Sequence, residues 1–580
     1  MMTMKTFRSL VIMLMVSAIT LTACGNTSSG KAPATDPSEI ILINQVGYLP
    51  SAPKMALIRA DKAGFQIVDA QSGKVVFEGT TGDWKEWKYS GDKVSTADFS
   101  MLQTPGKYKL VLPGLKVSSG EFTIGTGIYT NLVKAATKAY YFNRCSFEIT
   151  AQYGSKWARA AGHPDTGVMI HETAASKERP AGTMISSPGG WYDAGDYGKY
   201  IVNSGISVYT LLLFYQMYPG YCEKLSLDIP ESNNSLPDIV DEILYNLRWI
   251  LTMQDPNDGG VYHKLTTLRF DNFEMPAMDK AQRYVFAKST AATLDFAAVT
   301  AMAARLFQDD THPGLQSMAP SLLAASEKAM QWAEKNPDII FHNPEGVNTG
   351  EYGDRDLRDE FFWAKAELAL AKNDPSMVKA EDFMGLRDTI ASWGNVSMAG
   401  IWSLALTDNP AFAGIRQAAT ESVKTSASKL MDKYEASAYH TTIDFFAWGS
   451  NSDVANEAMA LIIAKKATGN NSYEPAILAG MDYLLGRNAT GYCFITGIGC
   501  KSPMNIHHRP SGSDGVAEPV PGFLVGGPNL IVPNDCGPLV KRPPYPAAAY
   551  SDLECSYSTN EIAINWNAPL IFVAGYLDQE

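Results

Sequence analysis

Residues 236–253 carry the sequence LPDIVDEILYNLRWILTM, which is the clearest helical pattern in the chain. Apolar residues recur along it at spacings of three and four, the period of an α-helix with one buried face. The members of this stripe are Ile239, Val240, Ile243, Leu244, Leu247, Ile250 and Leu251. A stripe of this kind needs an apolar partner, so the segment predicts a helix packed on other secondary structure.

Similar patterns fill the chain beyond residue 127. We expect further helices at residues 131–147, 287–306, 321–336, 359–371, 455–468 and 473–485. Loops rich in glycine, proline, asparagine and aromatic residues join them, among them 186–198 and 497–534. Strand signals are scarce in this part of the chain. Residues 127–580 therefore predict one large all-α domain with long functional loops on one face.

The preceding segment, residues 40–126, has a different pattern of short strands separated by turns. Tyr108, Leu110 and Leu112 alternate onto one face of one such strand, and a Pro-Gly pair stands before and after it. This spacing predicts a small antiparallel β-sandwich directly before the helical domain.

The N-terminal segment carries a targeting signal. Lys5 and Arg8 precede an apolar run at residues 10–21, and the segment closes on Leu-Thr-Ala-Cys at 21–24. It resembles a bacterial lipoprotein signal peptide at 1–24, with Cys24 as the lipidated first residue of the mature protein. An ordinary secretory signal or an uncleaved anchor is the alternative, although the run is shorter than the roughly 20 residues that span a bilayer. Residues 25–39 predict a flexible tether. We expect an exported protein, lipid-anchored to a bacterial membrane, at the outer membrane or cell surface.

Composition limits the possible partners. The formal net charge is -13 and no long basic run occurs, which argues against a nucleic-acid partner. Seven cysteines are present, and six are left when Cys24 is assigned to the lipid. An exported protein can oxidise them, but the spacing leaves their pairing open, and buried free thiols are an equal alternative. We expect a monomer.

Two segments carry carboxylates suited to chemistry. Residues 188–200 read PGGWYDAGDYGKY, which places Asp193 and Asp196 in a glycine-rich turn. Glycosidic cleavage needs a base to activate water and an acid to protonate the leaving oxygen, so a pair of carboxylates in different environments is the minimum apparatus. Capping of backbone amides would explain an isolated Asp-Ala-Gly-Asp as well.

The second segment, residues 550–569, reads YSDLECSYSTNEIAINWNAP. Aromatic and apolar neighbours would disfavour the ionised form of Glu561 and raise its pKa toward the range of a general acid. Alternatively, Glu561 could lie in the first turn of the last helix and complement its dipole.

A third segment, residues 501–510, reads KSPMNIHHRP. Adjacent histidines point in divergent directions in an extended chain, so a shared metal is not expected. His507 and Arg509 are better suited to binding sugar hydroxyls.

Together these segments resemble glycoside hydrolase family 9, in the family's order over residues 127–580. The C-terminal signature of the family is met at Tyr550, Asp552, Tyr557, Glu561, Ala563, Asn567 and Ala568. Its histidine signature is met at Ile495, Thr496, Gly499, Lys501, Ile506, His507 and Arg509, with Cys493 at a position the family fills with Ser, Thr or Val. Residues 350–368 also look like the family, and Asn-Gln-Val-Gly-Tyr at 44–48 resembles the start of the immunoglobulin-like domain that precedes many members.

The resemblance implies an (α/α)6 toroid behind an immunoglobulin-like sandwich, and an inverting endo-β-1,4-glucanase acting on cellulose-like, mixed-linkage or xyloglucan polysaccharide. Asp196 would be the base, Asp193 would help to hold the water and Glu561 would be the acid. The residues expected to bind sugar are His507, Arg509, Asp552, Trp191 and Tyr557.

The resemblance also bears on cofactors. The chemistry requires none, and structural calcium is plausible from the acidic loops. Some members hold zinc through Cys and His, but the closely spaced Cys-His pair of those members is broken in this chain, which has Cys145, His163 and His171; we expect no zinc.

Three other readings stay open. An exo-acting β-glucosidase or glucosaminidase of the same family would need loops that close one end of the expected cleft. A glycan-binding surface lipoprotein without catalysis would not need Asp193, Asp196 and Glu561 together. A polysaccharide lyase can share the toroid, but it would use a Tyr or His base.

Overall fold

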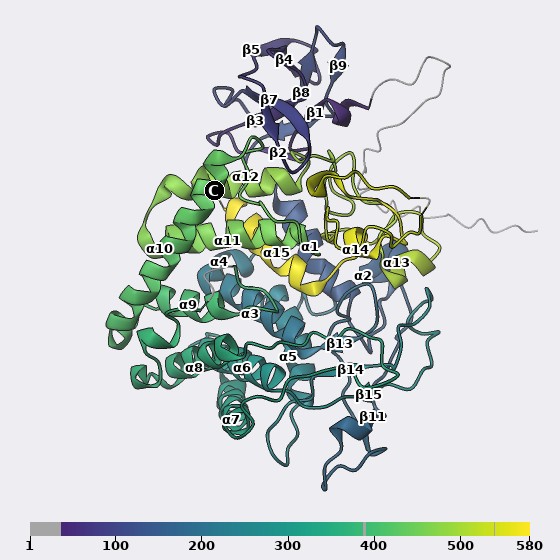
Figure 1. The fold of residues 1–580 in the computed structure, drawn as a ribbon, viewed down its shortest axis with the longest axis vertical. Coiled ribbons are helices and arrows are strands. Elements are labelled where there is room, and N and C mark those ends of the chain that lie inside the picture. The colour runs from purple at the N-terminus through teal and green to yellow at the C-terminus, as the bar shows by residue number, and fades with distance from the viewer. Residues whose placement is uncertain (1–35, 387–389, 539, 580) are drawn as a thin grey trace, which may run out of the picture. The chain divides into compact units, whose positions relative to one another are not determined.

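The computed structural model describes residues 36–386, 390–538 and 540–579, and shows a β-module followed by a helical domain (Figure 1). The predicted signal peptide, Cys24 and most of the predicted tether lie outside the described residues.

The β-module consists of two sheets. The first has the strand order β1 (Ile41–Leu42), β3 (Met55–Ile58), β7 (Asp92–Asp98) and β6 (Lys85–Trp87). The second has the order β2 (Gly47–Tyr48), β10 (Phe122–Ile124), β8 (Gly106–Leu112), β4 (Gly64–Asp69) and β5 (Val75–Thr80), with β9 (Val117–Ser118) also pairing β8. All pairs are antiparallel except β10 and β2. Buried residues alternate along β8, and the predicted face of Tyr108, Leu110 and Leu112 belongs to the apolar core of the module.

The helical domain is an (α/α)6 toroid, as the sequence predicted. Helix contacts run in a closed circuit through α3 (Ile201–Met217), α6 (Thr290–Gln308), α8 (Arg358–Lys372), α9 (Ser397–Leu406), α11 (Ser450–Thr468) and α15 (Ile564–Leu577), which returns to α3. Against this ring pack α1 (Thr130–Phe142), α5 (Asp238–Thr252), α7 (Pro313–Lys335), α10 (Ala413–Ala436) and α12 (Glu474–Leu484).

Burial differs between the ring helix α3 and the helix α7 packed against the ring. Helix α3 is enclosed along nearly its whole length, because its neighbours in the ring and α5 leave little of it in contact with water. Helix α7, by contrast, buries a single stripe. Helix α6 is long and apolar enough to cross a membrane by length and composition, but most of it is buried inside the protein. Its hydrophobicity is that of a core helix.

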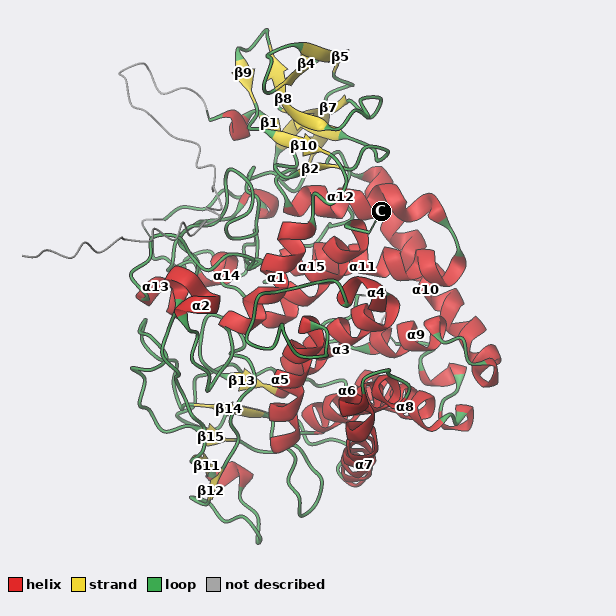
Figure 2. Cartoon of the chain, turned by 180° about the vertical axis from the view of Figure 1, so that it is seen from behind, coloured by secondary structure: helices red, strands yellow, loops and turns green. Residues whose placement is uncertain are grey.

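A small sheet inside the helical domain was not predicted (Figure 2). Its order is β12 (Met184–Ile185), β11 (Val168–Ile170), β15 (Tyr284–Val285), β14 (Lys264–Thr266) and β13 (Lys199–Tyr200). Strand β13 ends the loop that carries Asp193 and Asp196, so the sheet fixes one end of that loop.

The β-module packs on the toroid through polar and aromatic contacts. The Asn44 amide donates to Asp482 Oδ1 at 2.8 Å, and the Trp87 ring stacks on Tyr439 with 4.2 Å between centroids. Gln45 Oε1 accepts hydrogen bonds from the backbone amides of residues 500 and 501. The module thereby supports the loop that leads to His507.

Candidate active site

The loop before β13 folds back on itself and presents two carboxylates. The Asp193 amide donates to Gly198 O at 3.0 Å, and the Gly198 amide donates to Asp196 Oδ2 at 2.9 Å. Both aspartates are buried, with 1% and 6% of their surface exposed. Isolated capping of backbone amides does not account for this arrangement, because Asp193 also accepts from Asn203 and Tyr352 and the charge of Asp196 acts on Lys264 and Glu561.

Asp193 is the more buried of the two aspartates. Its carboxylate accepts hydrogen bonds from Asn203 Nδ2 at 3.0 Å and from the Tyr352 hydroxyl at 2.8 Å. Burial and then the nearby charge of Asp196 raise the pKa of Asp193 to about 8, against the opposing effect of these two donors. Asp193 is therefore suited to sharing or holding a proton near neutral pH.

Asp196 has a polar surrounding that differs from that of Asp193. Its Oδ2 accepts from the Tyr200 hydroxyl at 3.2 Å as well as from Gly198. The ammonium of Lys264 lies near enough for the charge of Asp196 to act on it. Burial lowers the pKa of Lys264 to about 7, while Asp196 acts in the opposite direction. The two aspartates are thus held by different donors, as a base and its helper require.

Glu561 comes to the same place from the far end of the chain. It follows α14 (Tyr557–Asn560) and precedes α15, which begins at Ile564, so it does not lie in the first turn of the last helix. Its Oε1 accepts a hydrogen bond of 3.3 Å from the Gly195 amide. Burial, and after it the charge of Asp196, raises the pKa of Glu561 well above its ordinary value, as the sequence predicted.

Gly195 is required where these segments meet. A Cβ built on it would lie 2.2 Å from His507 O and 3.1 Å from Glu561 Oε1. His507 in turn pairs with the chain beside Glu561, because its amide donates to Asn560 O at 2.9 Å. The three segments singled out in the sequence therefore converge on one site.

His507 is oriented by the backbone. Its Nδ1 lies 2.7 Å from Glu554 O, and because a carbonyl only accepts, Nδ1 carries the proton. Burial lowers the pKa of His507, which favours the neutral ring with Nε2 as an acceptor. Phe273 and Tyr557 meet the ring edge-on, with centroids at 5.1 and 5.9 Å.

Arg509 and Asp552 hold loops together. Arg509 donates to Gly195 O from Nη1 at 2.7 Å and to Asp271 O from Nε at 2.9 Å. Asp552 accepts from the amides of Met504 and Asn505. Both residues thus support the loops around His507 and Gly195, a role that the sequence analysis did not assign to them.

Trp191 and Tyr557 differ in exposure. Trp191 is 0% exposed: its ring packs on Tyr140 and its Nε1 lies 3.3 Å from a carboxylate oxygen of Glu242. No ring surface is left for a sugar, so Trp191 is a packing residue rather than a sugar-binding one. Tyr557 is partly exposed, and its ring lies 5.5 Å from that of Trp448, which is 40% exposed.

Four residues of this site were missed by the sequence analysis: Asn203, Tyr352, Lys264 and Trp448. Tyr352 falls in a segment that looked like the family, and its φ of +48° is a strained conformation that often marks a functional position. The other three carried no signal in the sequence, because only the fold brings them to the aspartates or to Tyr557.

A disulfide and an ion pair brace the segment before Glu561. Cys536 and Cys555 are joined. Asp535 Oδ2 accepts from the backbone and hydroxyl of Ser558 at 3.0 and 2.7 Å, and its carboxylate pairs with Arg542. Among the described cysteines, Cys145, Cys222 and Cys493 are buried thiols and Cys500 is exposed.

The residues considered for metal do not fit zinc. The Cys145 thiol donates to His163 O and Asp165, and the His163 ring lies between the Tyr192 hydroxyl and Asp279. His171 Nδ1 instead accepts from a neighbouring amide. Within the described part of the chain, no group of three or more His, Cys, Asp or Glu side chains is arranged to hold a metal ion.

Comparison with known proteins agrees with this geometry. Residues 129–574 match the model of glycosyl hydrolase family 9, and residues 36–117 match that of the cellulase N-terminal ig-like domain. The chain is 42% identical over 567 residues to Xyloglucan-specific endo-beta-1,4-glucanase BoGH9A of Bacteroides ovatus, covering 93% of this chain and 94% of that protein. It is 34% identical over 556 residues to Endoglucanase D of Acetivibrio thermocellus, covering 93% and 83%.

The solved structure of Bacteroides ovatus GH9 superposes with a TM-score of 0.86 at 41% identity, over 93% of this chain and 99% of that one. The family match covers most of the chain, and the alignments cover 94% and 83% of the length of these two relatives. The chain therefore belongs to glycosyl hydrolase family 9 and is a glycoside hydrolase.

Proposed function

We propose that this enzyme is an inverting endo-β-1,4-glucanase that acts on xyloglucan, with Asp196 as general base and Glu561 as general acid. The observation that carries the proposal is the hydrogen bond from the Gly195 amide to Glu561 Oε1. It holds the acid beside the loop of the base. The raised pKa of Glu561, caused first by burial, keeps a proton on that carboxyl for delivery.

In the proposed reaction, Asp196 removes a proton from a water molecule that attacks the anomeric carbon. Glu561 gives its proton to the departing glycosidic oxygen as that bond breaks. After the reaction Asp196 carries a proton and Glu561 has lost one, and proton transfer through solvent restores both groups. Asp193 holds the water, helped by Asn203 and Tyr352, which fix its carboxylate. The product anomer is then opposite to that of the substrate bond.

The polysaccharide is inferred from the relatives and from the exposed aromatic rings. The relative at 42% identity is named for xyloglucan, and Endoglucanase D is named for internal cleavage of glucan. Tyr557 lies next to His507 and Trp448 lies next to Tyr557, and both aromatic rings are partly exposed, which suits stacking on the apolar faces of β-linked sugars.

The test is hydrolysis of xyloglucan, mixed-linkage glucan and a soluble cellulose derivative by the full chain. Viscosity should fall rapidly on xyloglucan, and proton NMR should detect the α-anomer first. The Glu561→Gln variant should do neither. Release of monosaccharide alone would favour an exo-acting enzyme, and binding without turnover by the unmutated protein would contradict the proposal.

We also propose structural calcium and no zinc. Asp295 and Glu360 have buried carboxylate oxygens without hydrogen-bond partners, and burial raises the pKa of both well above its ordinary value. These two side chains are not a full ligand set, so a calcium ion there would take its remaining oxygen ligands from backbone carbonyls and water. Calcium should raise the melting temperature after chelation, and zinc should not; no response to calcium would contradict the proposal.

Localisation at a bacterial membrane and lipid attachment at Cys24 are part of the same proposal. They are supported by the sequence of residues 1–24 alone. The Cys24→Ser variant should lose lipid labelling and leave the membrane fraction. Unchanged membrane association would contradict lipid attachment at Cys24. We propose that the enzyme acts as a monomer with glucan as its partner, which size-exclusion chromatography with light scattering would check.

A further inference from the structure

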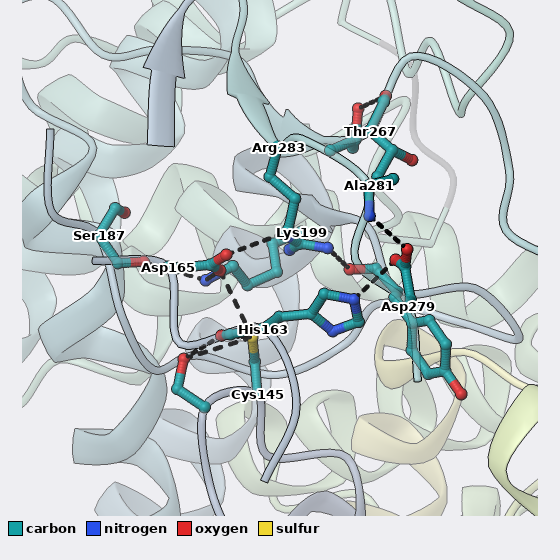
Figure 3. Close-up of polar contacts among 12 residues, drawn as sticks. Cys145, His163, Asp165, Ser187, Lys199, Thr267, Asp279, Ala281 and Arg283 are labelled. Atoms are coloured by element: carbon teal, nitrogen blue, oxygen red, sulfur yellow. Dashed lines mark hydrogen bonds and ion pairs between the residues drawn. The ribbon is translucent and has the colours of Figure 1, made fainter. Parts of the chain in front are cut away.

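Three buried charged side chains, shown in Figure 3, lie against residues 188–198, which we call the catalytic loop, and play no part in the reaction described above. They are Asp165, Lys199 and Arg283, and we call them the charge cluster. Asp165 Oδ2 lies 2.7 Å from Lys199 Nζ, and Asp165 Oδ1 lies 2.9 Å from Arg283 Nε. At most 5% of any of the three side chains is exposed.

The cluster joins three separate segments through one ionised carboxylate. Burial would raise the pKa of Asp165, but Arg283 and Lys199 outweigh it and lower that pKa. Lys199 belongs to β13 and Arg283 comes directly before β15. Asp165 itself has a φ of +49°, a strained conformation that persists only where the surroundings hold it.

Both cations of the cluster also bind the main chain of the catalytic loop. Arg283 Nη1 donates to Tyr197 O at 2.8 Å, one residue after Asp196. Lys199 Nζ donates to Gly189 O at 2.8 Å, near the start of the loop. The loop is therefore held at its two ends by two cations that share Asp165 as a counter-ion.

A second contact fixes the middle of the loop. His163, two residues before Asp165, has Nδ1 2.8 Å from the Tyr192 hydroxyl and Nε2 2.8 Å from Asp279 Oδ2. Tyr192 comes directly before Asp193. The segment 163–165 therefore supplies Asp165 to the charge cluster and also orients Tyr192, which precedes Asp193.

We propose that Arg283, paired with Asp165, is a positioning residue that fixes the catalytic loop so that Asp196 meets the water and Glu561 at the correct distance. The proposal rests on the proposed function. A loop with glycine at 189, 190, 195 and 198 has a wide choice of backbone conformations, so external anchors must select one. A shift of about 1 Å in a reacting group can cost roughly a hundredfold in rate.

The experiment compares Arg283→Met with Arg305→Met in the full chain. Arg305 Nη2 lies 3.1 Å from a buried oxygen of Glu367, so the control also removes a cation from a buried carboxylate, but between α6 and α8. Arg283→Lys is the conservative variant: it keeps the positive charge for Asp165 and cannot reach Tyr197 O with the same fork of donors.

Initial rates on a soluble β-1,4-glucan are measured at a temperature at which circular dichroism shows each variant folded. We expect kcat of Arg283→Met to fall roughly ten- to a hundredfold with KM within about threefold, because His507 and Tyr557, which are proposed to bind sugar, are unchanged. Arg283→Lys should recover the melting temperature more fully than kcat. Arg305→Met should have a lower melting temperature than the unmutated enzyme, with kcat within about twofold of the unmutated value.

Equal kcat values for Arg283→Met and Arg305→Met would overturn the proposal, and so would full recovery of kcat by Arg283→Lys. If Arg283→Met does not fold, Arg283→Lys decides the question. A melting temperature close to that of the unmutated enzyme together with a lowered kcat supports the proposal, and an unchanged kcat overturns it. Failure of the proposed function is distinguishable, because the unmutated enzyme would then not cleave the glucan at all.

Discussion

The backbone amide of Gly195 donates to Glu561 Oε1 across 366 positions of sequence. This one contact joins the loop of Asp196 to the segment before α15. Gly195 also has no room for a side chain, since a Cβ there would lie 2.2 Å from His507 O.

Gly195→Ala should therefore lower kcat by roughly tenfold or more, because either the loop or the acid has to move. The matched control is Gly314→Ala, where a Cβ would meet nothing within 4 Å. Steady-state rates of both variants on a soluble glucan check this. Similar rates for the two would show that the Gly195 contact does not position the acid.

Removing the acid should affect substrates unequally. Glu561→Gln should lose roughly a hundred- to ten-thousandfold on polysaccharide, since no proton reaches the leaving oxygen. It should lose far less on a cello-oligosaccharide with a dinitrophenyl leaving group, which departs without protonation. Asp196→Asn should lose activity on both. Equal losses of Glu561→Gln on the two substrates would remove Glu561 from the role of acid.

The pH profile should report the raised pKa of Glu561. Activity requires a protonated acid, so the rate should decline as pH rises through that pKa, which burial holds well above the ordinary value of 4.5. A plot of log kcat/KM against pH locates this alkaline limb. An alkaline limb near pH 4.5 would contradict the burial argument.

Ionisation of Asp193 should lower the free energy of unfolding as the pH rises. Its folded-state pKa of about 8 exceeds its ordinary 3.8, so the folded state keeps a proton that the unfolded chain has released. The stabilisation is complete below about pH 4 and is lost as pH rises toward about 8. The melting temperature of Asp193→Asn minus that of the unmutated enzyme should increase as pH rises through that window. The activity of the variant should be lower than that of the unmutated enzyme. An exposed control, Asp83→Asn, should show no such trend.

The disulfide should support both stability and rate. Cys536 and Cys555 are 19 positions apart, and closure of such a loop contributes roughly 2–4 kcal/mol. The double Ser variant should melt lower and turn over more slowly, because the braced segment leads to Glu561. Reducing agent should reproduce both losses in the unmutated enzyme and leave the double variant unchanged. An unmutated enzyme insensitive to reduction would contradict this.

Trp87 should couple the β-module to the toroid. It is 4% exposed and stacks on Tyr439, so Trp87→Ala should cost about 3–5 kcal/mol of unfolding free energy. Denaturant unfolding measures this. Trp84→Ala, at a position 46% exposed, should cost under about 1 kcal/mol, and equal losses would show that the contact with Tyr439 is not what matters.

The sequence by itself determined the elements whose pattern is local. Helix α5 was predictable because its apolar residues recur with the helical period, and strand β8 because buried residues alternate. Asp193, Asp196, His507 and Glu561 were predictable because their neighbours form motifs of fixed spacing. These signals depend only on residues close in the chain.

The tertiary structure decided what depends on distant partners. Helices α3 and α15 are buried on nearly all sides, which erases the period of 3.6 that would have revealed them. Trp191 became a packing residue because Tyr140 and Glu242 enclose it. The charge cluster exists only because the fold brings Asp165, Lys199 and Arg283 together, and the strength of such contacts depends on burial that no local pattern encodes.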